Sequence, residues 1–257
     1  MLMVLSPAKK LDYDTPVRTT RRSLPVFPDD TRELVGVLQR LSAGDLAGLM
    51  SLSDALARLN AERYAAWVDA PDHQHARQAA LAFNGDVYEG LRAAELSDAQ
   101  LDWAQDRLAI LSGLYGVLRP LDLIQPYRLE MGTRLRTARG ATLYAFWGDR
   151  IAQELNRRLD ALSGDRVLLN LASNEYFKSI DRKALRARVV ECVFQDEKNG
   201  AWKVISFHAK RARGLMARHV IDHAIEAVED LRGFEAEGYA YASEASSDDR
   251  LVFRRPA

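Results

Sequence analysis

The chain alternates between short, uniformly apolar runs and longer stretches with helical periodicity. Residues 2–5 and 167–171 are almost entirely apolar and are followed or bounded by turn residues, a pattern typical of strands buried on both faces. Residues 108–111 form a third run of this kind. Between these runs, apolar side chains recur at spacings of three and four, which predicts amphipathic helices. We therefore predict an α+β fold in which helices surround a mixed β-sheet.

Capping side chains indicate where the helices begin. Residues 7–29 contain four prolines and are predicted to be irregular, whereas residues 30–70 are predicted to form a small helical unit with tight turns. The predicted helices run from about Asp30 to Leu41, Ser42 to Met50, Ser53 to Val68, His73 to Ala82, Val87 to Ala94, Ser97 to Arg107, Gly148 to Leu162 and Ala209 to Val228.

Two hairpins are predicted in the last third of the chain. Val189–Gln195 and Ala201–His208 are rich in β-forming residues, and they flank Asn199-Gly200, which favours a type I′ turn. Tyr239–Tyr241 and Leu251–Phe253 are joined by a turn rich in serine and aspartate, and they should form a closing hairpin.

Composition restricts the domain number and the cellular location of the protein more than it restricts the reaction or ligand. The 257 residues allow one large domain or two small ones. No apolar run approaches the ~20 residues of a membrane span, and the first apolar run is too short for a signal peptide. We therefore expect a cytoplasmic protein without membrane association. The single cysteine, Cys192, excludes an internal disulfide and is predicted to point into the core.

Residues 111–132 are the least regular and among the most apolar parts of the chain. Gly113, Gly116, Pro120 and Pro126 exclude a plain helix or strand, and the many apolar side chains predict burial. Its polar side chains include Arg119, Asp122, Tyr127, Arg128 and Glu130. Buried polar groups need partners, so these side chains either satisfy one another or line a functional site.

Charge is distributed unevenly although the net charge is zero. Residues 176–218 contain eleven lysines and arginines against four acids, whereas residues 219–249 contain nine acids against one arginine. Such a division indicates a basic surface beside an acidic segment, or two segments that pair with each other.

The end of the predicted strand at residues 167–171 is a candidate ligand site. Asn170 lies at this end, and Glu175 and Lys178 follow in the turn and the start of a helix. Open α/β sheets place their ligands at such strand ends. An ordinary capped turn with a surface ion pair explains the same residues equally well.

A second junction, at residues 208–214, is strongly basic. Lys210, Arg211 and Arg213 lie at the start of a predicted helix, where cations oppose the helix dipole. An anion bound nearby would compensate for this arrangement. A basic face that is solvated or paired within the chain is the commoner explanation.

Common catalytic and metal-binding motifs are absent from the sequence. It contains neither GxGxxG nor GxxxxGK[ST], and neither HExxH nor CxxC. His73 and His75 are spaced by two, which does not place both on one helix face, and no third ligand accompanies them. We therefore expect no metal site and no cofactor.

Several longer motifs resemble one known family. They are Ser6–Lys9, Phe83–Tyr88, residues 111–132, Phe146–Asp149, Asn170–Ser179, Asp196–Gly200 and Ala209–Met216. In matching order along nearly the whole chain, they are similar to the YaaA peroxide-stress proteins. This chain differs in detail, because Asn84 replaces an expected lysine and Asn174 an expected aspartate.

The resemblance implies a single domain over residues 1–257, with a mixed α+β fold. It implies a cytosolic bacterial protein that limits oxidative damage to DNA and protein during peroxide stress by lowering reactive intracellular iron. It also implies binding of DNA through a basic cleft and a helix-hairpin-helix-like element, which corresponds to residues 42–68. The turn at residues 51–54 lacks the Gly-x-Gly typical of that element, so on its pattern alone this unit is a helical packing lobe.

The first hypothesis is therefore a stress protein that binds double-stranded or structured DNA without strong sequence preference. Residues 111–132 would form one wall of the cleft, and Arg128 should lie near Lys178 or Lys210 rather than point to bulk solvent. The expected anion-binding side chains are Lys9, Arg119, Arg128, Lys178, Lys210, Arg211 and Arg213.

The alternative hypothesis is an enzyme that acts on a nucleotide or another small anionic ligand in the same cleft. Acid and base groups in apolar segments favour this alternative, because a binder of the DNA backbone does not need them. The candidate catalytic side chains are Asp122, Tyr127, Glu130 and Glu175, with Asp86 beside them. A third hypothesis, direct iron sequestration, has little support from five histidines and one cysteine.

Overall fold

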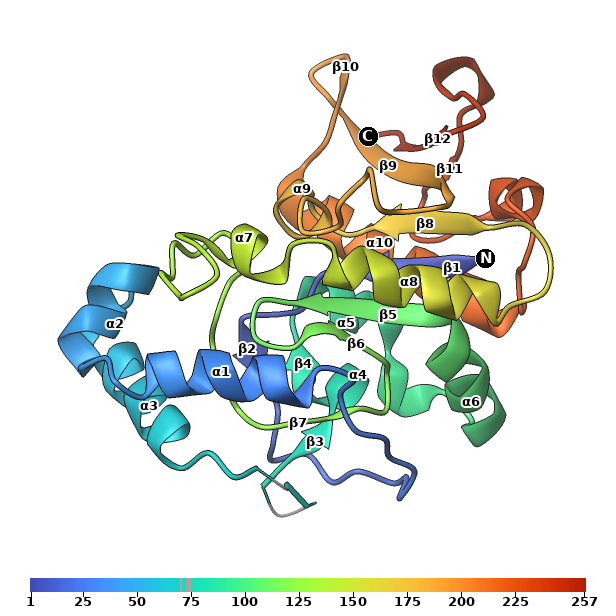
Figure 1. Ribbon diagram of the computed structural model, residues 1–257. Helices are drawn as coiled ribbons and strands as arrows, with labels where there is room; N and C mark the ends of the chain where they lie inside the picture. Colours follow the sequence, from blue (N-terminus) through green and yellow to red (C-terminus); the bar gives the residue numbers. More distant parts are fainter. Residues whose placement is uncertain (70, 73–74) are drawn as a thin grey trace.

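The computed structural model describes residues 1–69, 71–72 and 75–257, and its centre is a mixed β-sheet (Figure 1). The strands of this sheet are β1 (Leu2–Leu5), β5 (Leu108–Ser112), β6 (Gly116–Leu118), β8 (Val167–Leu171), β9 (Arg188–Lys198), β10 (Ala201–Lys203), β11 (Ala240–Tyr241) and β12 (Arg250–Arg255). Their order is β11-β12-β9-β8-β1-β5-β6, and β10 pairs with β9. The predicted mixed sheet is therefore confirmed.

The middle of the sheet is parallel. Strand β1 runs parallel to both of its neighbours, with Val4 opposite Ala109 of β5 and Asn170 of β8. Strands β9 and β12 continue the parallel arrangement, and the antiparallel strands β6, β10 and β11 are added around it. All residues of β1, β5 and β8 are buried, as their continuous apolar runs predict. The carboxyl ends of these three strands lie at one edge of the sheet.

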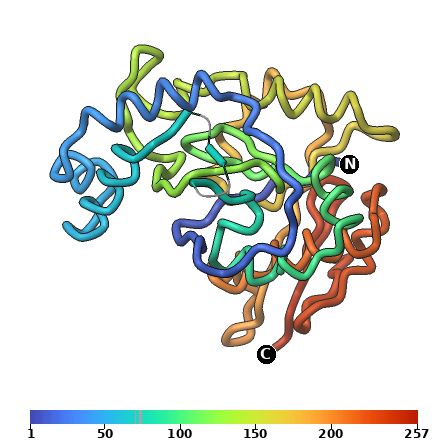
Figure 2. Tube along the Cα trace, turned by 90° about the horizontal axis from the view of Figure 1, so that it is seen from below, coloured from blue at the N-terminus to red at the C-terminus, as the bar shows by residue number. Residues whose placement is uncertain are grey.

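Helices cover both faces of this sheet. They are α1 (Pro28–Leu38), α2 (Ala43–Met50), α3 (Asp54–Ala65), α4 (Ala79–Ala82), α5 (Asp86–Leu91), α6 (Asp98–Arg107), α7 (Leu143–Trp147), α8 (Arg150–Asp160), α9 (Asn174–Phe177) and α10 (Ser206–Asp222). Figures 1 and 2 together show α1 and α8 on one side of the sheet, with α5, α6 and α10 on the other. One hydrophobic core connects the elements.

Helices α5 and α10 pack directly against each other because each carries a glycine at the contact. A Cβ atom at Gly214 would lie 1.8 Å from the carbonyl oxygen of Val87, and one at Gly90 would lie 2.3 Å from that of Arg211. Only glycine permits this approach, and it fixes the amino-terminal turns of both helices relative to each other.

Most predicted elements are confirmed, including both hairpins. Asn199 and Gly200 have φ values of 56° and 71°, as a type I′ turn requires, and β11 pairs antiparallel with β12. The helix starts at Ser42 and Ser97 are confirmed by reciprocal capping hydrogen bonds with Asp45 and Gln100.

Two predicted elements are wrong in type over part of their length. In the predicted helix 73–82, residues Arg77–Gln78 form the strand β3, which pairs with β7 (Leu123–Ile124). Among the described residues of this range, 75–82, only α4 is helical, and His73 lies outside the described residues. The predicted strand 201–208 ends with β10 at Lys203, because α10 begins at Ser206. That helix ends at Asp222, earlier than the predicted Val228.

The helical unit predicted for residues 30–70 is present. Helices α2 and α3 are joined by residues 51–53, where Ser51 has a φ of 52°. The Tyr64 hydroxyl donates a 2.6 Å hydrogen bond to the carbonyl oxygen of Arg128 and so ties α3 to segment 111–132. Nothing in this geometry identifies the unit as a helix-hairpin-helix of the DNA-binding kind.

Candidate functional site

A cleft of about 320 Å³ lies at the carboxyl ends of β1 and β8. We call it the carboxyl-edge cleft. Five segments that are distant in the sequence contribute side chains to it, because the parallel strands bring their carboxyl ends to the same edge. The residues that line it are Ser6, Pro7, Ala8, Lys9, Lys10, Asn84, Gly85, Asp86, Val87, Glu130, Ser173, Glu175, Tyr176, Lys210 and Arg213.

Two serines form the floor where β1 and β8 end. The Ser6 hydroxyl accepts a hydrogen bond from the Ser173 backbone N–H at 2.9 Å, and the two hydroxyls are 3.3 Å apart. The Tyr88 hydroxyl of α5 donates to the carbonyl oxygen of Ser6 at 3.1 Å. These contacts join the two strand ends to α5, so the floor of the cleft is fixed by hydrogen bonds.

Two of the three carboxylates of the cleft, Glu130 and Glu175, are held in place by neighbours. Glu130 lies between two cations, with Lys9 Nζ at 2.8 Å and an Arg128 guanidinium nitrogen at 3.2 Å. Glu175 accepts a 2.9 Å hydrogen bond from the Gly132 backbone N–H. The loop at residues 130–132 therefore meets the start of α9 through Glu175.

Several cations of this region have no acidic partner among the described residues. Lys10 and Lys210 are exposed and form no ion pair there, and Lys178 is likewise exposed at the end of α9. Arg213 lies one helical turn after Lys210, and burial lowers the pKa of its guanidinium. Four cations and three carboxylates line the cleft, so its lining is mixed in charge with a small positive excess.

The structure brings together about half of the predicted site residues. Lys9, Glu130, Glu175, Lys210 and Arg213 line the carboxyl-edge cleft. Arg128 reaches it through Glu130 and is directed at that carboxylate rather than at bulk solvent. Its expected proximity to Lys178 or Lys210 stays a prediction.

Asp122 and Arg119 lie outside the cleft and satisfy each other. The Asp122 carboxylate is fully buried and accepts hydrogen bonds from the Arg119 backbone N–H at 2.7 Å and from the Arg119 guanidinium at 3.0 and 3.2 Å. The Ser23 hydroxyl donates a fourth hydrogen bond at 2.6 Å. These contacts hold the segment 119–122 against residues 23–24. Asp122 and Arg119 therefore have a structural role.

Two further predicted residues, Tyr127 and Arg211, also have partners elsewhere. Tyr127 is buried and shares a 2.6 Å hydrogen bond with the Ser112 hydroxyl, and burial raises the pKa of its phenol. Arg211 forms an ion pair with Glu237 at 2.6 Å. Neither residue lines the carboxyl-edge cleft.

Sequence reasoning missed the cleft residues with the least distinctive side chains. Ser6, Ser173 and Tyr176 carry no charge, and the family motifs that contain them assign them no role. Their positions in the sequence could have identified the two serines as cleft residues, because Ser6 directly follows one apolar run and Ser173 follows another by two residues. Their proximity depends on the pairing of β1 with β8, which the sequence does not specify.

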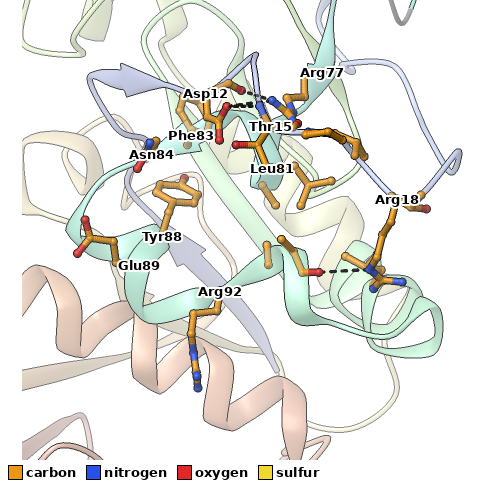
Figure 3. A pocket seen from close by; sticks show the side chains of 17 residues that line it. Asp12, Thr15, Arg18, Arg77, Leu81, Phe83, Asn84, Tyr88, Glu89 and Arg92 are labelled. Atoms are coloured by element: carbon orange, nitrogen blue, oxygen red, sulfur yellow. Dashed lines mark hydrogen bonds and ion pairs between the residues drawn. The ribbon is translucent and has the colours of Figure 1, made fainter.

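A second pocket, of about 270 Å³, lies between residues 12–19 and α5 (Figure 3). Its most buried cation, Arg77, binds the carbonyl oxygens of Asp12 and Thr15 and the Asp12 carboxylate. The guanidinium thus fastens the irregular segment 12–15 to β3. Asn84 lines both this pocket and the carboxyl-edge cleft.

Metal-ligating and thiol groups are sparse in the described part of the chain. No group of three or more His, Cys, Asp or Glu side chains is arranged there to hold a metal ion. His75 contacts the Asp72 carboxylate at 2.7 Å. Cys192 is buried as predicted, and burial raises the pKa of its thiol. Over the described residues, no helix combines the length and apolarity needed to cross a bilayer.

Comparison with known proteins gives consistent matches over the whole chain. The family described as peroxide stress protein YaaA matches residues 1–245. A UPF0246 protein of Bordetella petrii is 64% identical over 257 residues, which cover 100% of both chains. Similar proteins occur in Bordetella pertussis, at 63% identity over 255 residues, and in Azoarcus sp. strain BH72, at 58% over 260 residues; each match covers 99% of both chains.

Proposed function

Because the chain belongs to the YaaA peroxide-stress protein family, we propose that it protects DNA and protein in the cytoplasm by binding DNA and by lowering reactive intracellular iron. One observation carries the DNA-binding part of this proposal. Lys10, Lys178 and Lys210 are exposed in or beside the carboxyl-edge cleft and have no acidic partner among the described residues. Such cations can neutralise phosphates and release condensed counterions.

The mixed lining of the cleft is compatible with a phosphate backbone because two of its three carboxylates, Glu130 and Glu175, are engaged. Glu130 is neutralised by Lys9 and Arg128, and Glu175 accepts a hydrogen bond from the Gly132 N–H. Repulsion of phosphate is then reduced, while the unpaired lysines attract it. Contacts of this kind position a duplex without reading its sequence.

We assign a supporting contact to the hairpin of α2 and α3. The first backbone N–H groups of a helix are not used within the helix and favour anions. At the start of α3, Ser53 makes no side-chain cap to these groups. A second phosphate contact there would extend the DNA footprint beyond the cleft.

The effect on iron is proposed to be indirect. A dedicated iron site would need several clustered nitrogen, oxygen or sulfur ligands, and the chain has five histidines and one cysteine. The protein would then lower reactive iron without binding it, and DNA binding would in addition limit the access of iron-generated oxidants to the backbone. Isothermal titration of the purified protein with Fe(II) under anaerobic conditions should show no stoichiometric binding, and a one-to-one site would contradict this assignment.

Fluorescence anisotropy of a labelled 20-base-pair duplex over a salt series tests the DNA-binding proposal. We expect the logarithm of the association constant to fall linearly with the logarithm of salt concentration. Lys10→Ala/Lys210→Ala should reduce that slope by about 2, one unit per lost phosphate contact, and weaken binding at 100 mM salt by about tenfold.

Lys183→Ala is the matched control. Lys183 is an exposed lysine in the loop before β9, and the carbonyl oxygen of its neighbour Ala184 accepts a hydrogen bond from α8. Its slope and affinity should equal those of the wild type. Equal binding by the double variant and the wild type would remove the carboxyl-edge cleft as the DNA site.

One observation favours a second candidate function, an enzyme that acts on a nucleotide or another small anionic ligand. The Asp86, Glu130 and Glu175 carboxylates converge with Lys210 and Arg213 in one cleft of about 320 Å³, a size suited to a small molecule. Glu175→Gln keeps the shape of the side chain and removes its charge. Loss of peroxide protection in cells, with unchanged DNA affinity, would favour this candidate over DNA binding.

A further inference from the structure

The Asp86 carboxylate differs from the other two carboxylates of the carboxyl-edge cleft. It is half-buried at the start of α5, and it forms no hydrogen bond and no ion pair with any residue that the structure describes. Its charge interacts with that of Arg211, but Arg211 is already paired with Glu237 at 2.6 Å. A carboxylate in this state repels the phosphates of DNA. The cleft therefore carries a charged group that duplex binding does not need.

Cations without an acidic partner line the same cleft. Lys210 and Arg213 form no ion pair within the described part of the chain, and both line the cleft together with Asp86. A ligand that suits both kinds of group has an anionic end and, close to it, hydrogen-bond donors. Nucleotides have this combination, because their phosphate is joined to ribose hydroxyls. Dinucleotide-binding proteins use an Asp or Glu side chain to accept a hydrogen bond from the ribose 2′-hydroxyl.

Residues 83–88 form a wall that the cleft shares with the second pocket. Asn84 lines both, whereas Gly85–Val87 line only the cleft, and Phe83 and Tyr88 line only the second pocket of about 270 Å³. Figure 3 shows Asn84 beside Tyr88 at one end of this pocket. The cleft and the second pocket therefore adjoin at Asn84.

The second pocket suits a flat ring with a polar edge. Its walls are mainly apolar and include Val17, Leu81 and the ring pair of Phe83 and Tyr88, whose centroids are 5.3 Å apart. The Asn84 side-chain amide forms no hydrogen bond with the described residues, so its donor and its acceptor are both available. An asparagine amide matches the neighbouring donor and acceptor of adenine, a pairing that proteins use to recognise this base.

We propose that the carboxyl-edge cleft binds a free purine ribonucleotide. Lys210 and Arg213 hold its phosphate, Asp86 accepts hydrogen bonds from its ribose hydroxyls, and Asn84 contacts its base at the edge of the second pocket. This inference rests on the second candidate function and names the ligand of that function. DNA lacks the 2′-hydroxyl, so a preference for ribose separates this ligand from the duplex of the first proposal.

Isothermal titration of the full chain with AMP, 2′-deoxy-AMP and ribose 5-phosphate tests the inference. We expect AMP to bind at a single site. Binding of 2′-deoxy-AMP should be about tenfold weaker, because this nucleotide cannot donate the hydrogen bond to the charged carboxylate. Ribose 5-phosphate should also bind more weakly than AMP, since it has no base to contact Asn84.

Two variants separate the contacts of the ribose and of the base. Asp86→Ala should weaken AMP binding by about tenfold and abolish the preference for AMP over 2′-deoxy-AMP. A merely structural role of Asp86 would weaken the binding of both nucleotides and keep their ratio. Asn84→Ala should weaken AMP binding and leave that of ribose 5-phosphate unchanged. Duplex affinity should stay equal or rise in Asp86→Ala, because the variant removes a negative charge from the cleft.

Asp54→Ala is the matched control. Asp54 is an exposed acid in the first turn of α3, as Asp86 is an acid in the first turn of α5, and it lines neither the cleft nor the second pocket. The control should bind all three ligands like the wild type.

The remaining outcomes distinguish this inference from the proposed DNA binding. A wild type that binds the duplex but not AMP would overturn the inference and leave the DNA-binding proposal intact. AMP binding without duplex binding would support the inference and overturn that proposal. Equal wild-type affinity for AMP and 2′-deoxy-AMP would exclude Asp86 as a ribose contact and overturn the inference. Tighter binding of phosphoserine than of AMP would reassign the cleft to a phosphorylated amino acid and overturn it as well.

Discussion

Asp122 and Glu130 show how two carboxylates of one irregular segment acquire different tasks. Asp122 is fully buried and accepts four hydrogen bonds, whereas the Glu130 side chain is 24% exposed between two cations at the cleft. The sequence indicates that polar groups in this apolar segment need partners. It does not indicate which partner each one has, because Ser23 lies 99 positions from Asp122.

Asp122→Ala should therefore act on stability rather than on ligand binding. Removing the carboxylate leaves the Arg119 guanidinium without its partner, and breaking a buried pair in this way costs about 3–5 kcal/mol. Urea unfolding should show that loss in the free energy of unfolding. Glu235→Ala removes an exposed carboxylate and should change it by less than about 0.5 kcal/mol. A stable Asp122→Ala variant with lost DNA binding would return Asp122 to the functional candidates.

At the scale of elements, the contact between α5 and α10 positions the basic side of the cleft. Asp86 begins α5, and Lys210 and Arg213 lie near the start of α10. Their spacing depends on the close approach at Gly90 and Gly214. The sequence predicts both helices, but a glycine inside a helical pattern predicts only lower helix propensity. The neighbouring helix, whose close approach makes the glycine necessary, is visible only in the structure.

Gly214→Ala should destabilise the protein severely. Its Cβ would lie 1.8 Å from the Val87 carbonyl oxygen, so the two helices must separate, and we expect a loss of at least about 3 kcal/mol. Gly36→Ala is the contrasting variant, because a Cβ there, in the last turn of α1, meets nothing within 4 Å. It should stabilise the protein by about 0.5–1 kcal/mol. Thermal unfolding of both variants measures the difference, and equal effects would contradict the packing argument.

The errors at the level of elements have a common physical origin. Residues 201–208 are rich in β-forming side chains, yet the strand ends at Lys203, where pairing with β9 ends. Arg77 and Gln78 fall within a helical pattern but pair with Ile124 and Leu123. In both places, contacts with a distant segment override local propensity. The strands β1, β5 and β8 were predictable because burial on both faces leaves continuous apolar runs.

At the scale of the whole molecule, the basic and acidic segments partly neutralise each other. Arg211 pairs with Glu237 at 2.6 Å, and Arg188 pairs with Asp249 at 2.7 Å. Both pairs join the basic stretch 176–218 to the acidic stretch 219–249, so pairing between the two segments is confirmed for these residues. Within the basic stretch 176–218, as far as the structure describes the chain, the cations without an ion pair are Lys178, Arg182, Lys183, Lys198, Lys203, Lys210 and Arg213.

Glu237→Gln should strengthen DNA binding, because it removes the nearer of the two acidic partners of Arg211 and leaves only Glu89 at 3.7 Å. The Arg211 guanidinium holds the pKa of Glu237 below its usual range, so this carboxylate is charged at neutral pH and offsets the arginine. We expect the duplex dissociation constant to fall about twofold to threefold at low salt and the salt slope to increase by up to about 1. Glu235→Gln makes the same charge change at an exposed, unpaired acid and should have little effect. Unchanged affinity in Glu237→Gln would exclude Arg211 from the DNA footprint.

The position of β1 has a consequence for how the chain reaches its native state. This first strand lies between β5 and β8, so its partners are more than 100 and more than 160 residues away in the sequence. During synthesis, Leu2–Leu5 must wait for both partners to emerge, and loop closure over such separations is slow. Until then its apolar edge is unpaired, and the protein should depend on chaperones more than its size alone would indicate.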